Sequence, residues 1–338
     1  MVEMKYKNNS KWKFDTYQNA DYYVSGKRME EVRVKRIIEV ENFVKSYGDV
    51  KAVKGISFYV EEGRLFSFLG PNGAGKSTTI DTLCTLMDFD SGQITVDGFD
   101  LRSQPQSIRQ SIGVVFQDSV LDNLLTVREN LFIRAGLYNN GKSEIRRMVD
   151  ESIKVVELSE FLNRPYGKLS GGQRRRADIA AALLHKPKIL FLDEPTTGLD
   201  PQTRLAVWET VKKLQAESGT TVFLTTHYME EAADSDYIIV IDHGLIAARG
   251  TPQELKTEYS SDSLLIVPKS DDASVEIQKR LTNMECSVSG GIISVKLPDT
   301  LTSIAILESN KHQIASFQVL QGSMDDAFIG ITGKGIRQ

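Results

Sequence analysis

The stretch Leu65-Phe-Ser-Phe-Leu-Gly70-Pro-Asn-Gly-Ala-Gly-Lys-Ser-Thr78 decides the fold class of this 338-residue chain. Its first five residues are mostly apolar and predict a short buried strand, and a helical pattern follows Thr78. The segment between strand and helix matches the pattern G-x-x-x-x-G-K-[ST]. Glycines let such a loop turn so tightly that successive backbone N–H groups point into one concavity, where they bind phosphate oxygens. The sequence therefore predicts a nucleotide-binding loop between a strand and a helix.

This phosphate loop (residues 70–78) supplies most of the candidate nucleotide-binding residues. We expect the Lys76 ammonium to reach the β- and γ-phosphates of the nucleotide and the Ser77 hydroxyl to ligate Mg²⁺. The positive end of the following helix attracts the same phosphates. A glycine-rich turn could match the pattern by chance, but the strand before it and the helix after it argue against chance. The candidates are Gly70, Pro71, Asn72, Gly73, Ala74, Gly75, Lys76, Ser77 and Thr78.

A second motif, Ile189-Leu-Phe-Leu-Asp193-Glu194-Pro195, ends an apolar strand with two adjacent carboxylates. Neighbouring residues of a strand point to opposite sides. We expect Asp193 to hold Mg²⁺, directly or through water, and Glu194 to face the attacking water as a general base or orienting group. A strand that ends in Asp-Glu is common by itself, and it becomes specific in combination with the phosphate loop.

A third motif, Leu169-Ser170-Gly171-Gly172-Gln173, precedes a helical stretch that reaches Leu184. A Ser-Gly-Gly turn before a helix can present backbone N–H groups and a hydroxyl to an anion. It can also be an ordinary helix start with Ser170 as the N-cap, and both interpretations can hold at once. We interpret the following arginines, Arg174–Arg176, as a solvated helix face rather than a nucleic-acid patch.

Composition excludes several classes of protein. Apolar residues make up 41% and charged residues 25% of the chain, which is ordinary for a globular protein. No window approaches the run of apolar residues that a membrane-spanning helix needs, and the polar N-terminal stretch does not resemble a signal peptide. Cys84 and Cys286 cannot by themselves form a disulfide framework or a zinc site. The net charge of 41 − 45 = −4 is too small to draw the whole molecule to nucleic acid. A cytosolic protein fits these features.

The N-terminal extension, residues 1–36, differs from the rest of the chain in charge. It carries nine lysines and arginines against five acidic residues, and six aromatic residues lie within its first 23 positions. One interpretation is a solvated or partly ordered extension. The alternative is an arm that contacts anionic lipid or a membrane-bound partner, because basic and aromatic residues together suit that interface.

The rest of the chain divides into an α/β core with a helical insert and a smaller C-terminal domain. Strand patterns begin at Ile37, and helical periodicity dominates from about residue 118 to 184, as in Val127–Leu137 and Ser143–Leu158. A strand–helix–strand order over residues 189–225 implies a parallel sheet with crossover helices. Beyond residue 256 we expect strands at 263–267, 292–297 and 315–320, and helices at 273–282, 301–309 and 324–331. The predicted domains are 1–36, 37–256 with a helical subdomain at about 118–184, and 257–338.

The phosphate loop, the Leu169–Gln173 sequence and Asp193-Glu194 occur together, in this order along the chain, in the ATP-binding cassette (ABC) ATPases, and residues 37–255 resemble that family. The resemblance implies a phosphate-loop NTPase core with an antiparallel β subdomain, a helical insert and a small α+β C-terminal domain. It also implies roles for further residues. Tyr47 matches the aromatic that stacks on adenine, Gln117 matches the glutamine that senses Mg²⁺ and the transmembrane partner, and His227 matches the switch histidine at the γ-phosphate. Gly198-Leu199-Asp200 resembles the loop that crosses between subunits.

The family resemblance implies partners as well. Two such domains dimerise head to tail, with ATP between the phosphate loop of one and the Ser170–Gln173 turn of the other. This chain has one copy of each motif, so a second chain must complete each site. A homodimer is the simplest arrangement, and a heterodimer with a related ATPase stays open.

Within the family, the chain resembles the ATPase subunits of bacterial drug- and antibiotic-efflux exporters of the daunorubicin-resistance type. Three segments carry this resemblance: Leu125–Leu131, Gln173–Ala177 and Gly322–Gly333. It implies a peripheral protein on the cytoplasmic face of the membrane that drives efflux of a drug, antibiotic or lipid-like substrate through a separate integral membrane permease. The first 34 residues depart from that pattern. A soluble ABC ATPase without a transporter and an importer ATPase are the alternatives.

Overall fold

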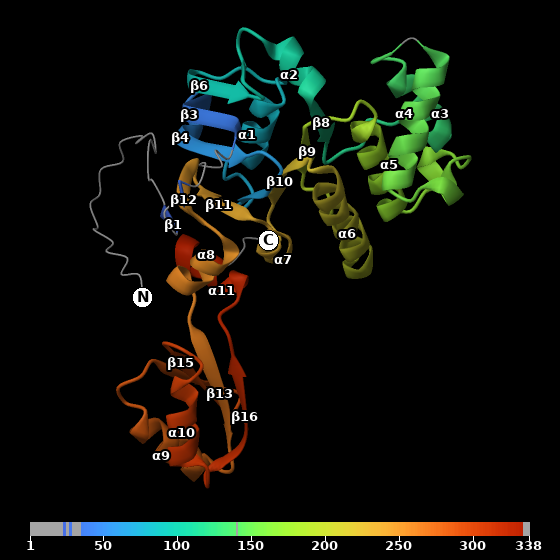
Figure 1. Ribbon diagram of the computed structural model, residues 1–338. Coiled ribbons are helices and arrows are strands. Elements are labelled where there is room, and N and C mark those ends of the chain that lie inside the picture. The colour runs from blue at the N-terminus through green and yellow to red at the C-terminus, as the bar shows by residue number, and fades with distance from the viewer. Residues whose placement is uncertain (1–22, 25–26, 29–34, 140, 334–338) are drawn as a thin grey trace. The chain divides into compact units, whose positions relative to one another are not determined.

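The computed structural model describes residues 23–24, 27–28, 35–139 and 141–333 (Figure 1). The N-terminal extension lies mostly outside these residues, so both interpretations of it, a solvated extension and an arm that contacts lipid or a partner, stay predictions. Of residues 1–35, which form a unit of their own, the described part includes β1 (Tyr23–Val24) and β2 (Lys27–Arg28), which pair antiparallel. Residues 36–338 form the second compact unit, to which all the candidate site residues belong.

A six-stranded sheet runs through the second unit in the order β12-β11-β5-β10-β9-β8. All neighbouring strands in it pair parallel except β12, which is antiparallel to β11. The three strands β5, β9 and β10 are buried along their whole length, as is usual for a parallel sheet. The predicted α/β class is confirmed. The strands are β5 (Leu65–Leu69), β8 (Ile112–Val115), β9 (Ile189–Asp193), β10 (Thr221–Thr226), β11 (Tyr237–Asp242) and β12 (Leu245–Gly250).

An antiparallel sheet in the order β4-β3-β6-β7 forms the second layer of this core. Its inward side chains join those of the parallel sheet in one apolar cluster, and the ring of Phe58 stacks on Phe66 with centroids 6.0 Å apart. The helix α1 (Lys76–Leu83) contacts both β4 and β9 (Figure 1). The strands are β3 (Arg36–Tyr47), β4 (Val50–Glu61), β6 (Ser91–Val96) and β7 (Phe99–Asp100), and α2 (Pro105–Ser111) follows them.

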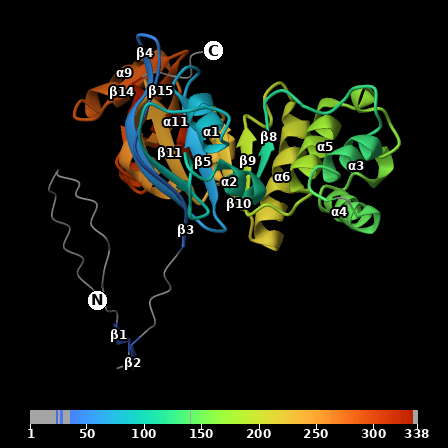
Figure 2. The ribbon, with the colours of Figure 1, turned by 90° about the horizontal axis from the view of Figure 1, so that it is seen from above.

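The helical insert consists of α3 (Val127–Ala135), α4 (Lys142–Val155) and α5 (Gly171–Leu183), which pack against one another (Figure 2). Two short 3₁₀ helices, Ser159–Phe161 and Tyr166–Lys168, connect α4 to α5. In the insert, α5 contacts β8 and α6 (Pro201–Ser218), and Glu157, after α4, accepts a hydrogen bond from Lys213 of α6 at 3.0 Å. Residues 118–126 contain no helix, so the helical structure begins later than the sequence pattern suggested.

The C-terminal region carries a four-stranded antiparallel sheet in the order β14-β15-β13-β16. Its helices α9 (Asp271–Arg280) and α10 (Thr302–Asn310) contribute Ile277 and Ile306 to a separate apolar cluster. The expected strands and helices are all present. The sequence analysis missed β14 (Cys286–Ser289), because its four residues are too short and too polar to show an alternating pattern. The other strands are β13 (Asp262–Pro268), β15 (Ile292–Leu297) and β16 (Ile314–Leu320).

The last helix, α11 (Met324–Thr332), packs against α8 (Pro252–Tyr259) and α7 (Met229–Ala233). Its Met324 and Phe328 enter an apolar cluster with Leu255 and with residues of the parallel sheet. The expected domain boundary at residue 256 therefore falls inside α8. The helix α11 packs with the α/β core, although residues 257–338 were expected to form a separate domain. In the described part of the chain, no helix is both long enough and apolar enough to cross a bilayer.

Truncating Phe328 tests whether α11 stabilises the α/β core. The Phe328 side chain is 2% exposed, so Phe328→Ala should lower the free energy of unfolding by about 3 kcal/mol. On the same helix Ile329 is 48% exposed, and Ile329→Ala should change that free energy by less than about 1 kcal/mol. Denaturant unfolding of both variants measures the difference. Equal effects of the two substitutions would contradict the packing of α11 into the core.

Candidate functional site

The phosphate loop leaves the carboxyl end of β5, which lies between β10 and β11. Gly75 has φ +107°, and a Cβ there would lie 2.8 Å from the carbonyl oxygen of Ala52, so only glycine fits this turn. The helix α1 begins at Lys76, and it has neither a side-chain cap nor an acidic residue in its first turn. The positive end of α1 is therefore suited to an anion.

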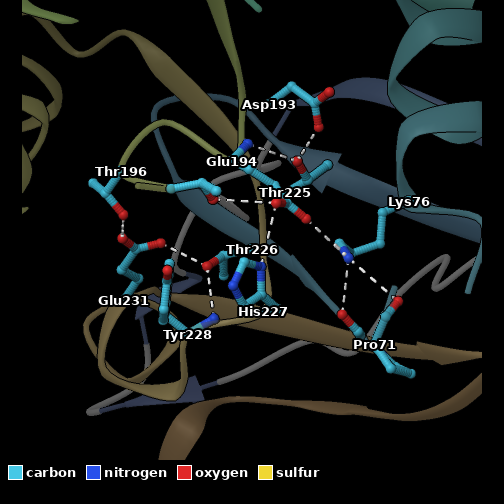
Figure 3. Close-up of polar contacts among 12 residues, drawn as sticks. Pro71, Lys76, Asp193, Glu194, Thr196, Thr225, Thr226, His227, Tyr228 and Glu231 are labelled. Carbon is cyan, nitrogen blue, oxygen red and sulfur yellow. Dashed lines mark hydrogen bonds and ion pairs between the residues drawn. The ribbon is translucent and has the colours of Figure 1, made fainter. Parts of the chain in front are cut away.

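Lys76 lies at the centre of the site and is only 4% exposed. Its Nζ donates to the carbonyl oxygens of Gly70 at 2.9 Å and Pro71 at 3.3 Å (Figure 3). The same Nζ lies 3.1 Å from Oε1 of Glu194. A buried ammonium group needs such partners, because desolvation without them is costly. The structure thus brings Lys76 of the phosphate loop into contact with Glu194 at the acidic strand end.

Glu194 contacts residues of three different segments. Its Oε2 lies 3.3 Å from Nδ1 of His227 and accepts a hydrogen bond from Thr197 at 3.2 Å (Figure 3). Its backbone N–H donates to the carbonyl and hydroxyl oxygens of Thr225, both at 3.1 Å. Its φ of +43° is unusual for a residue with a side chain, and such strain concentrates at functional positions.

The ionisation of Glu194 follows from its neighbours. Burial pushes the pKa of Glu194 upward, but Lys76 and, after it, His227 outweigh burial and hold this pKa below the usual range of a glutamate. The carboxylate therefore stays ionised at neutral pH, which is the state that can accept a proton or orient a water molecule.

Asp193 ends β9 and has a different partner from Glu194. The register of the parallel pair β9–β10 places Asp193 opposite Thr225, whose hydroxyl donates to Asp193 Oδ1 at 2.5 Å. Burial raises the pKa of Asp193, with Thr225, Lys76 and Arg175 acting in the opposite direction. The two adjacent carboxylates thus have separate surroundings and opposite pKa shifts.

A buried glutamate that the sequence analysis missed, Glu231, lies behind these residues. Its carboxylate accepts hydrogen bonds from the hydroxyl of Thr196 and, at 2.6 Å, from that of Thr226 (Figure 3). Burial raises the pKa of Glu231, and both threonine hydrogen bonds oppose that rise. The five-residue helix α7 is too short to show which of its two adjacent glutamates faces inward, so periodicity could not single out Glu231.

Tyr47, the expected adenine-stacking residue, lies next to the helix of the phosphate loop. Its hydroxyl is 3.5 Å from that of Thr78 and donates to the sulfur of Met87 at 2.8 Å. The side chain is about half exposed. The structure thus places an accessible aromatic ring at the end of β3 beside α1.

Gln117 lies two residues beyond β8, the strand next to β9, and its side chain is exposed. Within the described residues, no hydrogen bond joins this side chain to Asp193 or Ser77, its expected co-ligands for Mg²⁺. The backbone is held instead by Arg175, which donates to the carbonyl oxygens of Phe116 at 2.6 Å and Gln117 at 3.1 Å.

The interpretation of Arg174–Arg176 as a solvated face is wrong for Arg175, which is buried. Asp178 lies one turn further along α5 and accepts hydrogen bonds from Ser119 at 2.6 Å and from Tyr166 at 3.0 Å. Both ends of the segment 116–119 are therefore hydrogen-bonded to side chains of α5. The burial of Arg175 depends on tertiary contacts, so the run of three arginines could not predict which of them is buried.

The Ser170–Gln173 turn begins α5 as a capping box, so the N-cap interpretation is confirmed. Gln173 N–H donates to Ser170 Oγ at 3.4 Å, and Ser170 N–H donates to Gln173 Oε1 at 3.0 Å. A Cβ at Gly172 would lie 2.3 Å from Cγ2 of Thr203, so the turn packs directly on α6. Asp200 caps α6 by accepting from Thr203 N–H at 3.0 Å. No hydrogen bond or ion pair of the described residues links this turn to the phosphate loop.

Comparison with known proteins shows similarity to ATP-binding proteins that are named for drug resistance or for export. The ABC transporter family matches residues 53–197. The daunorubicin/doxorubicin resistance ATP-binding protein of Streptomyces peucetius is 39% identical over 88% of this chain and 93% of its own length. The linearmycin resistance ATP-binding protein of Bacillus subtilis is 37% identical over 89% of this chain and its own full length. The Nod factor export ATP-binding protein I of Ralstonia nicotianae is 35% identical over 89% and 95%.

Solved structures with the same fold are also ATP-binding cassettes. A dimeric cassette in a post-hydrolysis state, bound to ADP and phosphate, has 32% sequence identity and a TM-score of 0.58, covering 64% of this chain and 98% of that one. The protein cbiO1 from Clostridium perfringens, part of an ABC transporter complex, has 32% identity and a TM-score of 0.62, covering 66% and 91%. Both cover about two thirds of this chain.

Arg175 offers a test of the attachment between α5 and residues 116–119. Arg175→Ala removes two hydrogen bonds donated by a charged group, each worth about 1.5 kcal/mol, so unfolding should require about 3 kcal/mol less. The neighbouring Arg174 is exposed, and Arg174→Ala should cost less than about 0.5 kcal/mol. Thermal or denaturant unfolding measures both. A variant Arg175→Ala as stable as Arg174→Ala would show that these contacts do not hold the segment.

Proposed function

The chain belongs to the ABC transporter family of ATP-binding proteins, and from this membership we propose that it is the ATP-hydrolysing subunit of an exporter. The observation that carries the proposal is the convergence of Lys76, Glu194 and His227 at the carboxyl edge of the parallel sheet. The similarity to drug-resistance and Nod factor export proteins favours an exporter whose substrate is a drug, antibiotic or lipid-like molecule.

The phosphate loop is the proposed ATP-binding element. The uncapped start of α1 and the ammonium of Lys76 supply the positive charge that the phosphates require. Lys76 would exchange its contacts with carbonyl oxygens and Glu194 for contacts with the β- and γ-phosphates. Tyr47, beside Thr78, would stack on the adenine ring.

Hydrolysis is the proposed role of Glu194 and His227. The oxygen of a water molecule forms a bond to the γ-phosphorus while the bond to the β–γ bridging oxygen breaks, and ADP leaves with that electron pair. The ionised Glu194 orients this water and accepts its proton. His227, which lies against the same carboxylate, would donate a hydrogen bond to the γ-phosphate.

Ser77, Asp193 and Gln117 are the proposed holders of Mg²⁺. The donor set fits this ion, since Mg²⁺ takes oxygen ligands from a few side chains together with phosphate oxygens. Thr225 fixes one oxygen of the Asp193 carboxylate and thereby orients the group at the end of β9. When bound, Mg²⁺ would neutralise charge on the β- and γ-phosphates. Ser77 is exposed in the first turn of α1.

A second chain is the proposed source of the Ser170–Gln173 turn at each ATP. Within one chain this turn begins α5, beside Asp200 and α6, rather than at the phosphate loop. Two identical chains arranged head to tail would place the turn and Asp200 of each against the phosphate loop of the other. ATP would then be shared by both subunits and would stabilise the closed dimer through its higher affinity for that state.

An integral membrane permease is the other proposed partner, which would hold this chain at the cytoplasmic face of the membrane. A groove of about 270 Å³ between the segment after β8, α3 and α5 is lined by the apolar side chains of Leu86, Val120 and Tyr138. These side chains are exposed and adjoin residues 116–119, which Arg175 and Asp178 attach to α5. A permease segment in this groove would therefore contact both the Gln117 segment and the helical insert.

Replacing Glu194 tests the proposed hydrolysis. Glu194→Gln keeps the shape but cannot accept a proton, so ATP turnover should fall at least about 100-fold while ATP binding and an ATP-dependent dimer persist. Lys76→Ala should instead abolish both ATP binding and the dimer. Phosphate release and size-exclusion light scattering measure these outcomes. Normal turnover by Glu194→Gln would overturn the role of Glu194.

Purification of the tagged chain from solubilised membranes tests the exporter proposal. A multi-span protein should accompany the chain in equal amounts. Val120→Asp should weaken that association about tenfold or more, because an unpaired carboxylate in a buried interface is costly. Val275→Asp on α9 is the matched control, since Val275 is 51% and Val120 55% exposed. A chain recovered only from the soluble fraction, still hydrolysing ATP, would contradict the exporter.

A further inference from the structure

The buried carboxylate of Glu231 joins two segments that belong to different strands. It is 2% exposed, and each of its oxygens accepts a threonine hydroxyl: Oε1 that of Thr196, and Oε2 that of Thr226 at 2.6 Å. Both threonines are themselves fully buried. The hydroxyls have no access to water, so this carboxylate is their acceptor in the folded chain.

The two threonines lie beside the proposed catalytic residues. Thr196 comes two residues after Glu194, and its neighbour Thr197 donates to the Glu194 carboxylate at 3.2 Å. Thr226 immediately precedes His227, and its hydroxyl also accepts the backbone N–H of Tyr228 at 2.9 Å (Figure 3). The main chain on both sides of His227 is therefore held through one hydroxyl.

The same network reaches the phosphate loop. The carbonyl oxygen of Thr226 accepts the N–H of Gly70, the first residue of the loop, at 3.3 Å. On the other side, Ser235 Oγ donates to the backbone carbonyl of Glu231 at 3.5 Å and lies 2.5 Å from the hydroxyl of Ser67 in β5. Glu231 is thus linked through Ser235 to the strand that leads into the loop, and through its carboxylate to the segment after β9 and to the end of β10.

We propose that Glu231 is a positioning residue for ATP hydrolysis, which sets the distance between Glu194 and His227 by binding Thr196, two residues after Glu194, and Thr226, the residue before His227. This inference rests on the roles proposed above for Glu194 and His227. Both oxygens of one rigid carboxylate are used, so the segments after β9 and β10 cannot shift independently. A displacement of about 1 Å between groups that act together can cost about 100-fold in rate.

A purely structural role for Glu231 makes a different prediction. If the carboxylate only stabilised the fold, its replacement would lower the melting temperature and weaken nucleotide binding and turnover together. If it positions Glu194 against His227, turnover falls while binding through the phosphate loop persists. The partners of Lys76 are Gly70, Pro71 and Glu194, and the network reaches the loop through the backbone carbonyl of Thr226, which the replacement leaves in place.

The decisive variant is Glu231→Gln, with Glu230→Gln as its matched control. Glutamine keeps the size of the side chain but turns one acceptor oxygen into a donor that faces a donating hydroxyl. We expect kcat for ATP to fall about 10- to 100-fold, with KM and the Kd of a non-hydrolysable ATP analogue within about twofold of the unaltered protein. Glu230 is exposed and pairs with Arg204, so Glu230→Gln should leave all three values unchanged.

The Thr226 variants extend the test in case Glu231→Gln folds poorly. Thr226→Val removes the hydroxyl at nearly constant shape, and Thr226→Ser retains it. We therefore expect kcat to be much lower for Thr226→Val than for Thr226→Ser. Full kcat in Glu231→Gln, or equal loss of kcat and analogue affinity in Glu231→Gln and Thr226→Val, would overturn the proposal. If the unaltered chain does not hydrolyse ATP, the proposed function itself is overturned. If the unaltered chain hydrolyses ATP, Glu194→Gln does not and Glu231→Gln has a normal kcat, only this inference is rejected.

Discussion

The parallel pairing of β10 with β5 on one side and β9 on the other is the constraint on which the site depends. The register places Leu69 beside Thr226 and Asp193 beside Thr225, so the phosphate loop, the acidic pair and His227 all leave the sheet at one edge. All three strands are buried on both faces. A slip of one residue in either pair would turn every side chain of the strand to the other face, and would separate Lys76 from Glu194.

Charge at this edge is balanced by short-range contacts in a region with little water. The Lys76 ammonium has two carbonyl oxygens and one carboxylate oxygen as partners, and Glu194 adds contacts with Thr197 and His227. Threonine hydroxyls orient the remaining buried carboxylates, Thr225 for Asp193 and Thr196 with Thr226 for Glu231. In a low-dielectric interior each of these contacts is stronger than in water, and each unpaired group would be correspondingly costly. The polar residues behind the site therefore act as a connected set.

The helical insert is attached to this edge through α5. Its first turn packs on Thr203 of α6, and one turn later Arg175 and Asp178 hold the segment that contains Gln117. A rotation of α5 against the sheet would therefore displace the backbone at Phe116 and Gln117. The groove lined by Val120 and Tyr138 lies over the same segment. A partner in the groove and a partner at the Ser170 turn would thus act on one continuous helix.

The sequence by itself determined the fold class, the phosphate loop, the acidic strand end and the Ser170 helix start. Each of these features requires particular residue types at fixed short spacings, such as glycine where φ is positive or serine three residues before its capping partner. Only the tertiary structure decided that Arg175 is buried, that Glu231 joins two strand ends, and that α11 packs against α8. These three depend on contacts between residues far apart in the chain. The residues around a buried arginine or glutamate in a helix can be the same as those around an exposed one, so no local sequence pattern distinguishes the two.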